Sequence, residues 1–470
     1  MVTRHSVQPR LEFIAPDFNP WFVRLVHTAL PLLLRVRLRS WLPAGIRKVH
    51  CQQADILAES LSQFQQGKIR LLLAFRHGEV DDPLGMAYLF SRALPRAAKQ
   101  QGISLKYPVH SYFMYDRGMP LWAGRWLGWL FSRLGGIPVH RGRRLDLKAI
   151  KAVREKLLNG EMPVGIAPEG ATNGHSESIS DLEPGTAQLA FWCVEDLHKA
   201  GRPEHMLLLP IGLQYHYPNA NWAALDQLMS QLEADVGLPV LAFAASEQAT
   251  TDDYYHRLIR LGERLLTQME QFYRRFFHRD LAPSTGATTS AGNTDTDIGQ
   301  RLEKLLHEAL RVGEEFFGLP SNGSTATRCR RLEEAGWAYT YREDIESIAA
   351  LSPVERGLAD WVSEVANLNT RHMRLVESFV AVTDHYVKDK PSFERFAETT
   401  LILFDLVERL KGTKVPRRPQ MGLRDVTVTI GQPINVCDRW PEYSQSHRSA
   451  KQAVGQLTQD LQTALEKLIQ

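Results

Sequence analysis

The 470-residue sequence is 44% hydrophobic and 23% charged, which is enough apolar material for more than one folded domain and excludes a disordered chain. The net charge of +3 combines a basic first part, with 27 Lys and Arg against 18 Asp and Glu in residues 1–220, and an acidic remainder, so we expect the first part to bind an anionic partner. Four scattered cysteines without zinc-ligand spacing favour a reduced compartment and predict no metal site; they are Cys51, Cys193, Cys329 and Cys437.

The N-terminal segment, residues 1–50, predicts contact with a membrane surface. Residues 20–42 combine aromatic and aliphatic side chains with four arginines, the composition of a helix lying in an anionic membrane interface. The arginines are Arg24, Arg35, Arg37 and Arg39. A helix packed on the protein's own core is the alternative. The longest charge-free apolar segment, 25–34, is far shorter than the roughly 20 residues that span a bilayer.

The expected location is therefore cytoplasmic and peripheral, that is, monotopic on the membrane. The first residues lack the charged, apolar and small-residue order of a signal peptide, so secretion is not expected. Residues 119–134 raise the same question of membrane contact, because tryptophan is favoured at bilayer interfaces. This segment contains Trp122, Trp126 and Trp129.

Short apolar runs dominate residues 51–220, and each ends in a polar, glycine-bearing turn before a helical pattern. The runs are Ile69–Phe75, Leu105–Phe113, Met162–Ala167 and Met206–Leu213. This alternation predicts an α/β fold with a mostly parallel sheet flanked by helices. Ligands collect at the carboxyl ends of such strands, so we expect His77, Glu169 and a turn at 210–212 near one another.

A large helical insertion is predicted at residues 221–420. Helical patterns cover Tyr254–Phe277, Arg301–Phe317 and Pro353–Lys388, and two polar segments, 281–297 and 320–327, are typical of loops. Strand alternation returns at Asp425–Val436, before a final helix at Ser449–Ile469. Because a single strand is not stable alone, we expect residues 421–470 to complete the sheet of the α/β domain that begins at 51–220.

The stretch Arg76-His77-Gly78-Glu79 follows a buried apolar run, and Asp82 stands five positions after His77. Neutral imidazole can take the proton of an alcohol, and a carboxylate on the other ring nitrogen fixes the tautomer and stabilises the imidazolium. The pair therefore suits acyl transfer to a hydroxyl. Asp82 before Pro83 also suits a helix N-cap, and both roles are compatible.

The same stretch resembles the loop of the histidine phosphatases in which a histidine becomes phosphorylated. That interpretation needs Arg76 beside a phosphoryl group and a second histidine after a later strand, for which His110 and His175 are the candidates. Neither stands in a His-Gly context. A non-catalytic lipid-binding scaffold, suggested by the helical insertion, is a third class.

A phosphate site is predicted from two further stretches of the sequence. The stretch 136–142 ends in an arginine cluster that begins at Arg141 and could clamp a phosphate in bidentate fashion, although a solvated surface is the simpler alternative. Another strand ends in Pro168-Glu169-Gly170, where glycine lets backbone N–H groups approach an anion. Glu169 is expected to hold the loop or Arg141 in place.

Taken in order, these blocks resemble the glycerophospholipid acyltransferase family, including its 1-acylglycerol-3-phosphate acyltransferases. The matching stretches are His77 to Asp82, 136–141, 168–170, 209–212 and the closing strand 430–434. The resemblance covers about residues 50–220 and 421–470 and implies a glycerol-3-phosphate acyltransferase-like fold. It implies His77 as base, Asp82 as its partner, Arg141, Glu169 and Gly170 as the phosphate site, and Pro210 near the acyl donor.

The implied reaction moves a fatty acyl chain from coenzyme A or acyl carrier protein to lysophosphatidate, without a cofactor or a nucleic-acid partner. Two departures from the family pattern, Arg76 before the histidine and Ala171 after Glu-Gly, leave the acceptor open. Glycerol 3-phosphate is one alternative acceptor. The Asp81-Asp82-Pro83 form also keeps transacylation between phospholipids as an alternative.

Overall fold

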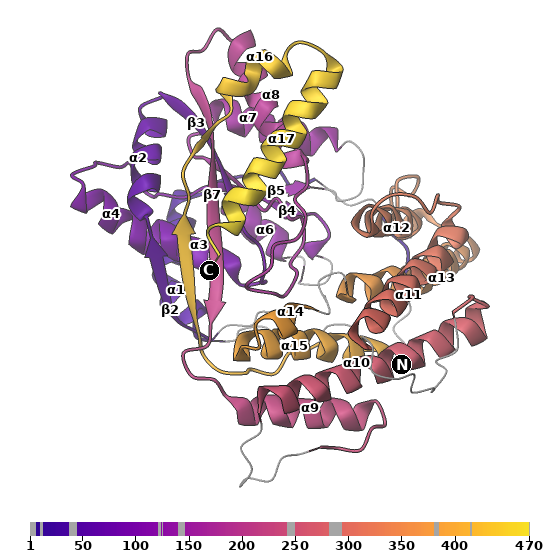
Figure 1. Cartoon of the computed structure of the whole chain (residues 1–470). Helices are drawn as coiled ribbons and strands as arrows, with labels where there is room; N and C mark the ends of the chain where they lie inside the picture. The colour runs from indigo at the N-terminus through magenta and orange to yellow at the C-terminus, as the bar shows by residue number, and fades with distance from the viewer. Residues whose placement is uncertain are drawn as a thin grey trace. The chain divides into compact units, whose positions relative to one another are not determined.

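The computed structural model describes residues 6–9, 13–36, 45–120, 124, 126–139, 146–241, 250–281, 294–379, 385–413 and 416–469. Within these ranges the chain forms two compact units (Figure 1). An α/β unit contains residues between 13 and 219 together with 422–469, and a helical unit contains residues 6–9 and 220–421. The helical unit is thus inserted between two parts of the α/β unit.

A mostly parallel sheet forms the centre of the α/β unit, in the order β2-β9-β7-β3-β6-β4-β5 with β10 beside β7. The strands are β2 Ile46–Gln52, β3 Ile69–Phe75, β4 Tyr112–Asp116, β5 Gly136–Val139, β6 Val164–Ile166, β7 His205–His216, β9 Arg424–Ile430 and β10 Ile434–Asn435. Strand β3 pairs in parallel with β6 and β7, whereas β9 and β10 run antiparallel to β7. This architecture confirms the predicted fold class.

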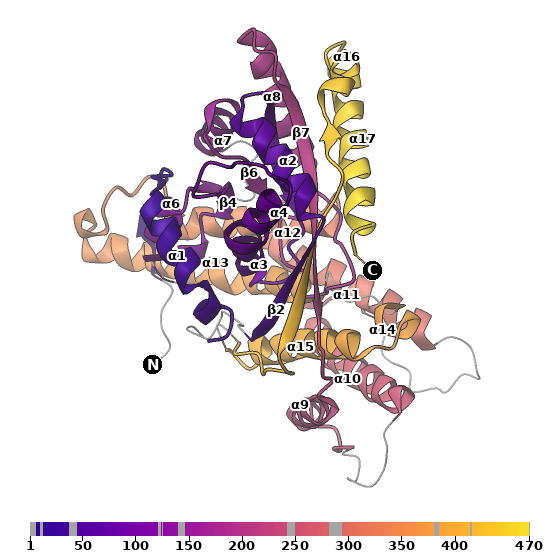
Figure 2. The same ribbon diagram turned by 90° about the vertical axis from the view of Figure 1, so that its left-hand side faces the viewer.

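Helices cover both faces of the sheet, so its strands alternate between two apolar layers. In β3, Leu71 and Leu73 pack on one side, and Leu72 and Ala74 on the other. The first layer contains α1 Pro20–Leu33, α2 Ala54–Gln65, α3 Asp82–Tyr88, the π-helical turn η1 Leu89–Ala93 and α4 Leu94–Gln100. The second contains α7 Leu147–Asn159, α8 Gly185–Lys199 and α17 His447–Glu466 (Figure 2). Three short elements complete the unit: α6 Trp126–Arg133, η3 Cys437–Arg439 and α16 Trp440–Tyr443.

Most predicted strands are confirmed, and two predictions are corrected. Strand β4 begins only at Tyr112, so residues 105–111 are not a strand; Pro108 has no N–H to donate to a neighbour. The predicted turn at 210–212 is wrong, because β7 continues through it to His216. The partner of β7 changes there from β10, at Leu208, to β9, at Ile211, so Pro210 interrupts no ladder.

The helical unit confirms a helical insertion. Its elements are α9 Trp222–Asp235, α10 Thr251–Phe277, α11 Thr294–Phe317, α12 Thr325–Thr340, η2 Ile348–Ala350, α13 Pro353–Phe379, α14 His385–Asp389 and α15 Phe393–Leu410. The predicted loop at 320–327 leads into α12, whereas residues 282–293 of the other polar segment lie outside the described residues. A parallel pair of two-residue strands, β1 Gln8–Pro9 and β8 Tyr341–Arg342, joins the first described residues to this unit.

Candidate active site

His77 lies just beyond the carboxyl end of β3, and Asp82 is the first residue of α3. The structure brings them together: His77 Nδ1 is 3.1 Å from Asp82 Oδ2. The Asp82 side chain is fully buried, whereas the His77 side chain is 25% exposed. A carboxylate oxygen only accepts hydrogen bonds, so Nδ1 carries the ring proton and Nε2 keeps a lone pair that can accept one.

Two further donors orient the Asp82 carboxylate. Its Oδ2 also accepts the N–H of Glu79 at 2.9 Å, and its Oδ1 accepts the hydroxyl of Tyr215, in β7, at 2.6 Å. Burial, followed by the charges of Asp81 and Asp82, raises the pKa of Tyr215 well above its ordinary value, so the hydroxyl stays protonated and donates. Asp82 therefore presents one fixed oxygen to the imidazole.

Asp82 is not the N-cap residue that the sequence predicts, because the cap lies one position earlier. Helix α3 begins at Asp82 itself, so Asp81 occupies the cap position, and the Asp81 side chain makes no capping hydrogen bond. The close approach of α3 to the sheet depends instead on Gly85, where a Cβ would lie 3.1 Å from Leu213. The carboxylate of Asp82 is thereby placed for His77 by helix packing.

Asp81 forms a buried ion pair with Arg424, the first residue of β9. Arg424 Nη2 lies 2.6 Å from Asp81 Oδ2, and its guanidinium stacks 4.5 Å from the centre of the Tyr215 ring. Burial raises the pKa of Asp81 to about 6, against the opposing effect of Arg424. The segment that follows the helical insertion therefore supports the loop that carries His77 and Asp82.

Glu169 fastens the backbone of His77 to the loop after β6. Its Oε1 accepts the N–H of His77 at 2.8 Å, and its Oε2 accepts the N–H of Ser180 at 3.1 Å. Burial raises the pKa of the Glu169 carboxyl, while Arg76 and the two amide donors oppose that shift. Gly170 follows with a φ of 74°, a left-handed conformation that suits glycine.

Arg76 serves as a buried support for the same loop. The guanidinium, in a residue 1% exposed, donates to the carbonyls of His175, Ser176, Ser178 and Leu213. These bonds connect the end of β3 to the 175–178 segment and to β7. An arginine committed to four carbonyls cannot clamp a phosphoryl group, which argues against the phosphatase interpretation.

The two candidate second histidines also serve the core. His110 lies with Nε2 3.0 Å from the carbonyl of Leu134 and packs its ring against Phe18 and Phe90. Burial, and then His27, lowers the pKa of His110 to about 4. His175 is 1% exposed. Neither presents an accessible second imidazole beside His77.

The other predicted site residues are distributed as follows. Arg141 lies outside the described residues, two positions after the end of β5. Pro210 is buried within β7, opposite Ala74 of β3, and its carbonyl accepts the N–H of Gly431 at 2.9 Å. Among the described residues, no group of three or more His, Cys, Asp and Glu side chains could hold a metal ion.

Part of the α/β unit matches a known protein family. Residues 58–194 match the Acyltransferase family, which supports acyltransferase activity. The matched segment runs from α2 into α8 and includes His77, Asp82, Arg141 and the Glu-Gly loop. No curated protein matches the sequence. Tyr215 and Arg424, which support the pair from β7 and β9, lie outside the matched range.

Sequence reasoning missed these two supporting residues. Tyr215 had a weak signal, because it alternates with Ile211 and Leu213 and so faces the same side of β7 as the helix that carries Asp82. Arg424 had none, since it stands 343 positions after Asp81.

An exposed aromatic surface lies on the α/β unit, where α1 and α6 meet. The rings of Phe22 and Trp129 are in edge contact with centroids 5.4 Å apart. Helix α1 buries Val23 and Leu30, as the core-packing alternative predicts for one face. Its other face and α6 expose large apolar side chains, namely Trp21, Leu25, Leu32, Trp126 and Trp129. Trp122 and residues 37–44 lie outside the described residues.

Proposed function

We propose that the protein transfers a fatty acyl chain from an acyl thioester to the free hydroxyl of a phosphorylated glycerol lipid precursor. The acceptor we favour is lysophosphatidate, which would give phosphatidate for phospholipid synthesis. The observation that carries the proposal is the 3.1 Å contact between His77 and the buried carboxylate of Asp82, within a matched acyltransferase domain. The co-substrate is a thioester of coenzyme A or acyl carrier protein.

The chemistry requires one base and no covalent enzyme intermediate. His77 Nε2 takes the proton of the acceptor hydroxyl as its oxygen attacks the thioester carbonyl carbon. The tetrahedral adduct then breaks its carbon–sulfur bond, and the departing thiolate takes the proton back from the imidazolium. Asp82 stabilises that transient cation and holds the ring in the productive tautomer.

Phosphate binding would place the hydroxyl beside His77. In this proposal Arg141 and the backbone around Gly170 hold the phosphate. Glu169 holds the loop and the His77 backbone together by accepting two amide hydrogen bonds. Because binding energy at the remote phosphate orients the reacting group, loss of the phosphate from the acceptor should slow turnover as well as binding.

The protein would act as a peripheral enzyme on the cytoplasmic face of a membrane. The exposed apolar side chains of α1 and α6 are of the type that enters a bilayer interface. No described helix is long and apolar enough to cross a bilayer. A lipid acceptor with an acyl chain would reach the site from that surface, which favours lysophosphatidate over glycerol 3-phosphate.

The test is to incubate the purified full-length protein with palmitoyl-coenzyme A or palmitoyl-acyl carrier protein and a panel of acceptors. The panel contains lysophosphatidate, glycerol 3-phosphate, monoacylglycerol and lysophosphatidylcholine with a phospholipid donor, and mass spectrometry identifies the products. The proposal expects phosphatidate and free thiol. Acylation of glycerol 3-phosphate alone would establish the alternative acceptor, acyl exchange without a thioester would establish the transacylase, and phosphate release without acylation would contradict the class.

A further inference from the structure

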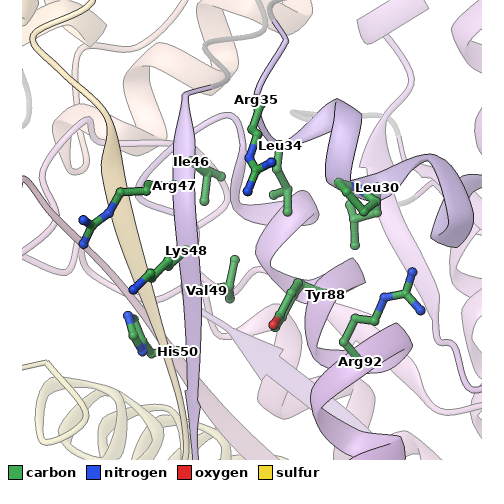
Figure 3. A pocket seen from close by; sticks show the side chains of 11 residues that line it. Leu30, Leu34, Arg35, Ile46, Arg47, Lys48, Val49, His50, Tyr88 and Arg92 are labelled. Carbon is green, nitrogen blue, oxygen red and sulfur yellow. The ribbon is translucent and has the colours of Figure 1, made fainter.

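A pocket lies on the α/β unit, between the end of α1, the edge strand β2 and the α3–η1 turn (Figure 3). Its volume is about 280 Å³. The apolar part of its wall consists of Leu30, Leu34, Ile46, Val49 and the ring of Tyr88. Backbone bonds from Gly45 and Ile46 to the carbonyl of Leu34 join α1 to β2 at this point. We call this the α1–β2 pocket.

The ionisable side chains that line the α1–β2 pocket, apart from the Tyr88 phenol, are all basic. They are Arg35, Arg47, Lys48, His50 and Arg92, with no Asp or Glu among the lining residues. Asp425 lies 2.6 Å from Arg47 and 3.6 Å from His50, so these two side chains already have an acidic partner. Arg35 and Arg92 are exposed and make no ion pair with the described part of the chain, and they remain able to bind an anion.

The arrangement of these groups suits a ligand with a phosphate and an apolar part. In Figure 3, Arg35 and Arg92 lie at opposite ends of the group formed by Leu34, Leu30 and Tyr88, whereas Arg47 and Lys48 project from the opposite side of β2. Arginine binds phosphate oxygens through two parallel N–H donors. A phosphate diester bound by either guanidinium group would leave its glycerol against the apolar wall.

The pocket opens beside the apolar part of α1 and its continuation. Leu32 and Val36, which flank the lining residues Leu34 and Arg35, are among the exposed large hydrophobic side chains of the chain. A volume near the lower end of the range for small-molecule sites accommodates a headgroup and not a whole two-chain lipid. The acyl chains of such a ligand would therefore lie outside the pocket, along this apolar surface.

We propose that the α1–β2 pocket binds the headgroup of an anionic phospholipid whose acyl chains remain in the bilayer. The site is separate from the catalytic centre, because its lining includes none of His77, Asp82, Glu169 and Gly170. This proposal rests on the membrane attachment proposed above, and binding at the pocket would make that attachment selective for anionic surfaces. Basic pockets next to an interfacial helix recognise lipid headgroups by this combination of charge and apolar contact.

The experiment measures binding of the full-length protein to vesicles, without any acyl donor. Flotation compares phosphatidylcholine vesicles with vesicles that contain 20% phosphatidylglycerol by design, for wild type and for the double variant Arg35→Gln/Arg92→Gln. We expect at least tenfold tighter binding of wild type to the anionic vesicles and loss of most of that preference in the double variant. Turnover is not measured, so failure here and failure of the acyltransferase proposal remain distinguishable.

The matched control is the double variant Arg24→Gln/Arg96→Gln, which removes two exposed charges of the same α/β unit outside the pocket. Each charge near an anionic surface contributes about 1 kcal/mol, roughly fivefold in affinity, so general electrostatics alone would cost either double variant up to about 25-fold. Binding in the pocket predicts a larger loss in Arg35→Gln/Arg92→Gln than in the control, and an equal loss in the two double variants would overturn the pocket.

A competition measurement on wild type gives a second, independent criterion. Soluble dihexanoyl phosphatidylglycerol should displace the protein from vesicles in a saturable manner, whereas inorganic phosphate at the same concentration should not. Equal displacement by inorganic phosphate would assign the pocket to free phosphate and refute a lipid ligand. Absence of displacement by the short-chain lipid would also refute it.

Discussion

Two histidines, one in each unit of this protein, both contact an oxygen through Nδ1, but only one of them is suited to act as a base. His372, in α13 of the helical unit, lies with Nδ1 2.7 Å from the hydroxyl of Tyr273, and His77 lies with Nδ1 3.1 Å from Asp82. His372 is buried, and burial, then Arg279, lowers its pKa to about 4. His77 instead combines an anionic partner with a partly exposed ring.

The difference shows what separates a catalytic imidazole from a structural one. A base must reach its substrate through one nitrogen and must be stabilised as a cation through the other. A neutral hydroxyl partner and an apolar enclosure, which includes the edge contact with Phe277 at 4.7 Å, deny His372 both conditions. In the proposed reaction, the buried carboxylate of Asp82 and the partly exposed ring beyond the carboxyl end of β3 would meet both conditions for His77.

Asp82→Asn should produce the largest change, because it makes the partner of His77 neutral like that of His372. The asparagine amide can also donate to Nδ1 and so favour the wrong tautomer. We expect kcat to fall by about 10³-fold with little change in KM for the acceptor, in steady-state assays. Tyr273→Phe, which removes the partner of His372, is the matched control and should leave kcat within about twofold. A loss under tenfold in Asp82→Asn would contradict the assigned role.

Arg424→Met tests whether the ion pair between Arg424 and Asp81 stabilises the fold. The variant leaves the fully buried Asp81 carboxylate without its cation, and removal of one partner of a buried pair costs about 3–5 kcal/mol. Urea unfolding should show this loss in the free energy of unfolding. The double variant Asp81→Asn/Arg424→Met should recover most of it, and a double variant as unstable as the single one would exclude the ion pair as the cause.

His372→Gln tests how the buried histidine changes the free energy of unfolding with pH. The folded-state pKa of His372 is lowered to about 4 from 6.5, so the unfolded chain takes up the proton first. Its contribution to stability is present above about pH 6.5 and is lost as the pH falls toward 4, by on the order of 3 kcal/mol at about 1.36 kcal/mol per pKa unit. Denaturant unfolding at pH 7 and pH 4.5 should show a smaller acid-induced loss in the variant. An unchanged loss would mean that His372 is already solvated.

Tyr215→Phe should have the smallest effect, because it removes one hydrogen bond to Asp82 and keeps the ring under Arg424. A single hydrogen bond to a charged group contributes about 1.5–3 kcal/mol, so kcat should fall by roughly ten- to 150-fold with KM unchanged. The pH dependence of kcat/KM should also move, since Asp82 would hold the imidazolium differently. A purely structural tyrosine would leave that profile in place.

The sheet was predictable where its strands are apolar. Ile69–Phe75 is a continuous buried run, and its predicted bounds are those of β3. The edge strand β2 was missed because four of its seven residues are Arg, Lys, His or Gln, and β5 because Gly136 and Pro138 occupy half of its four positions. Such strands are specified by their neighbours in the sheet and not by their own pattern.

The contact between His77 and Asp82 was predictable because their spacing and their position after a buried strand are local. Its supports come from distant segments: Tyr215 from β7 and Arg424 from β9, beyond the helical insertion. No periodicity links residues so far apart. The role of Arg76 was also missed, because a run of Arg-His-Gly suggests chemistry while the guanidinium in fact holds four carbonyls of the surrounding backbone.

The most direct test of the account is the turnover number of His77→Ala with lysophosphatidate and an acyl thioester. If His77 Nε2 is the base, kcat should fall by about 10³-fold or more while the midpoint of thermal unfolding stays within a few degrees of wild type. Turnover within tenfold of wild type in the folded variant would contradict the central claim that this imidazole removes the proton of the acceptor.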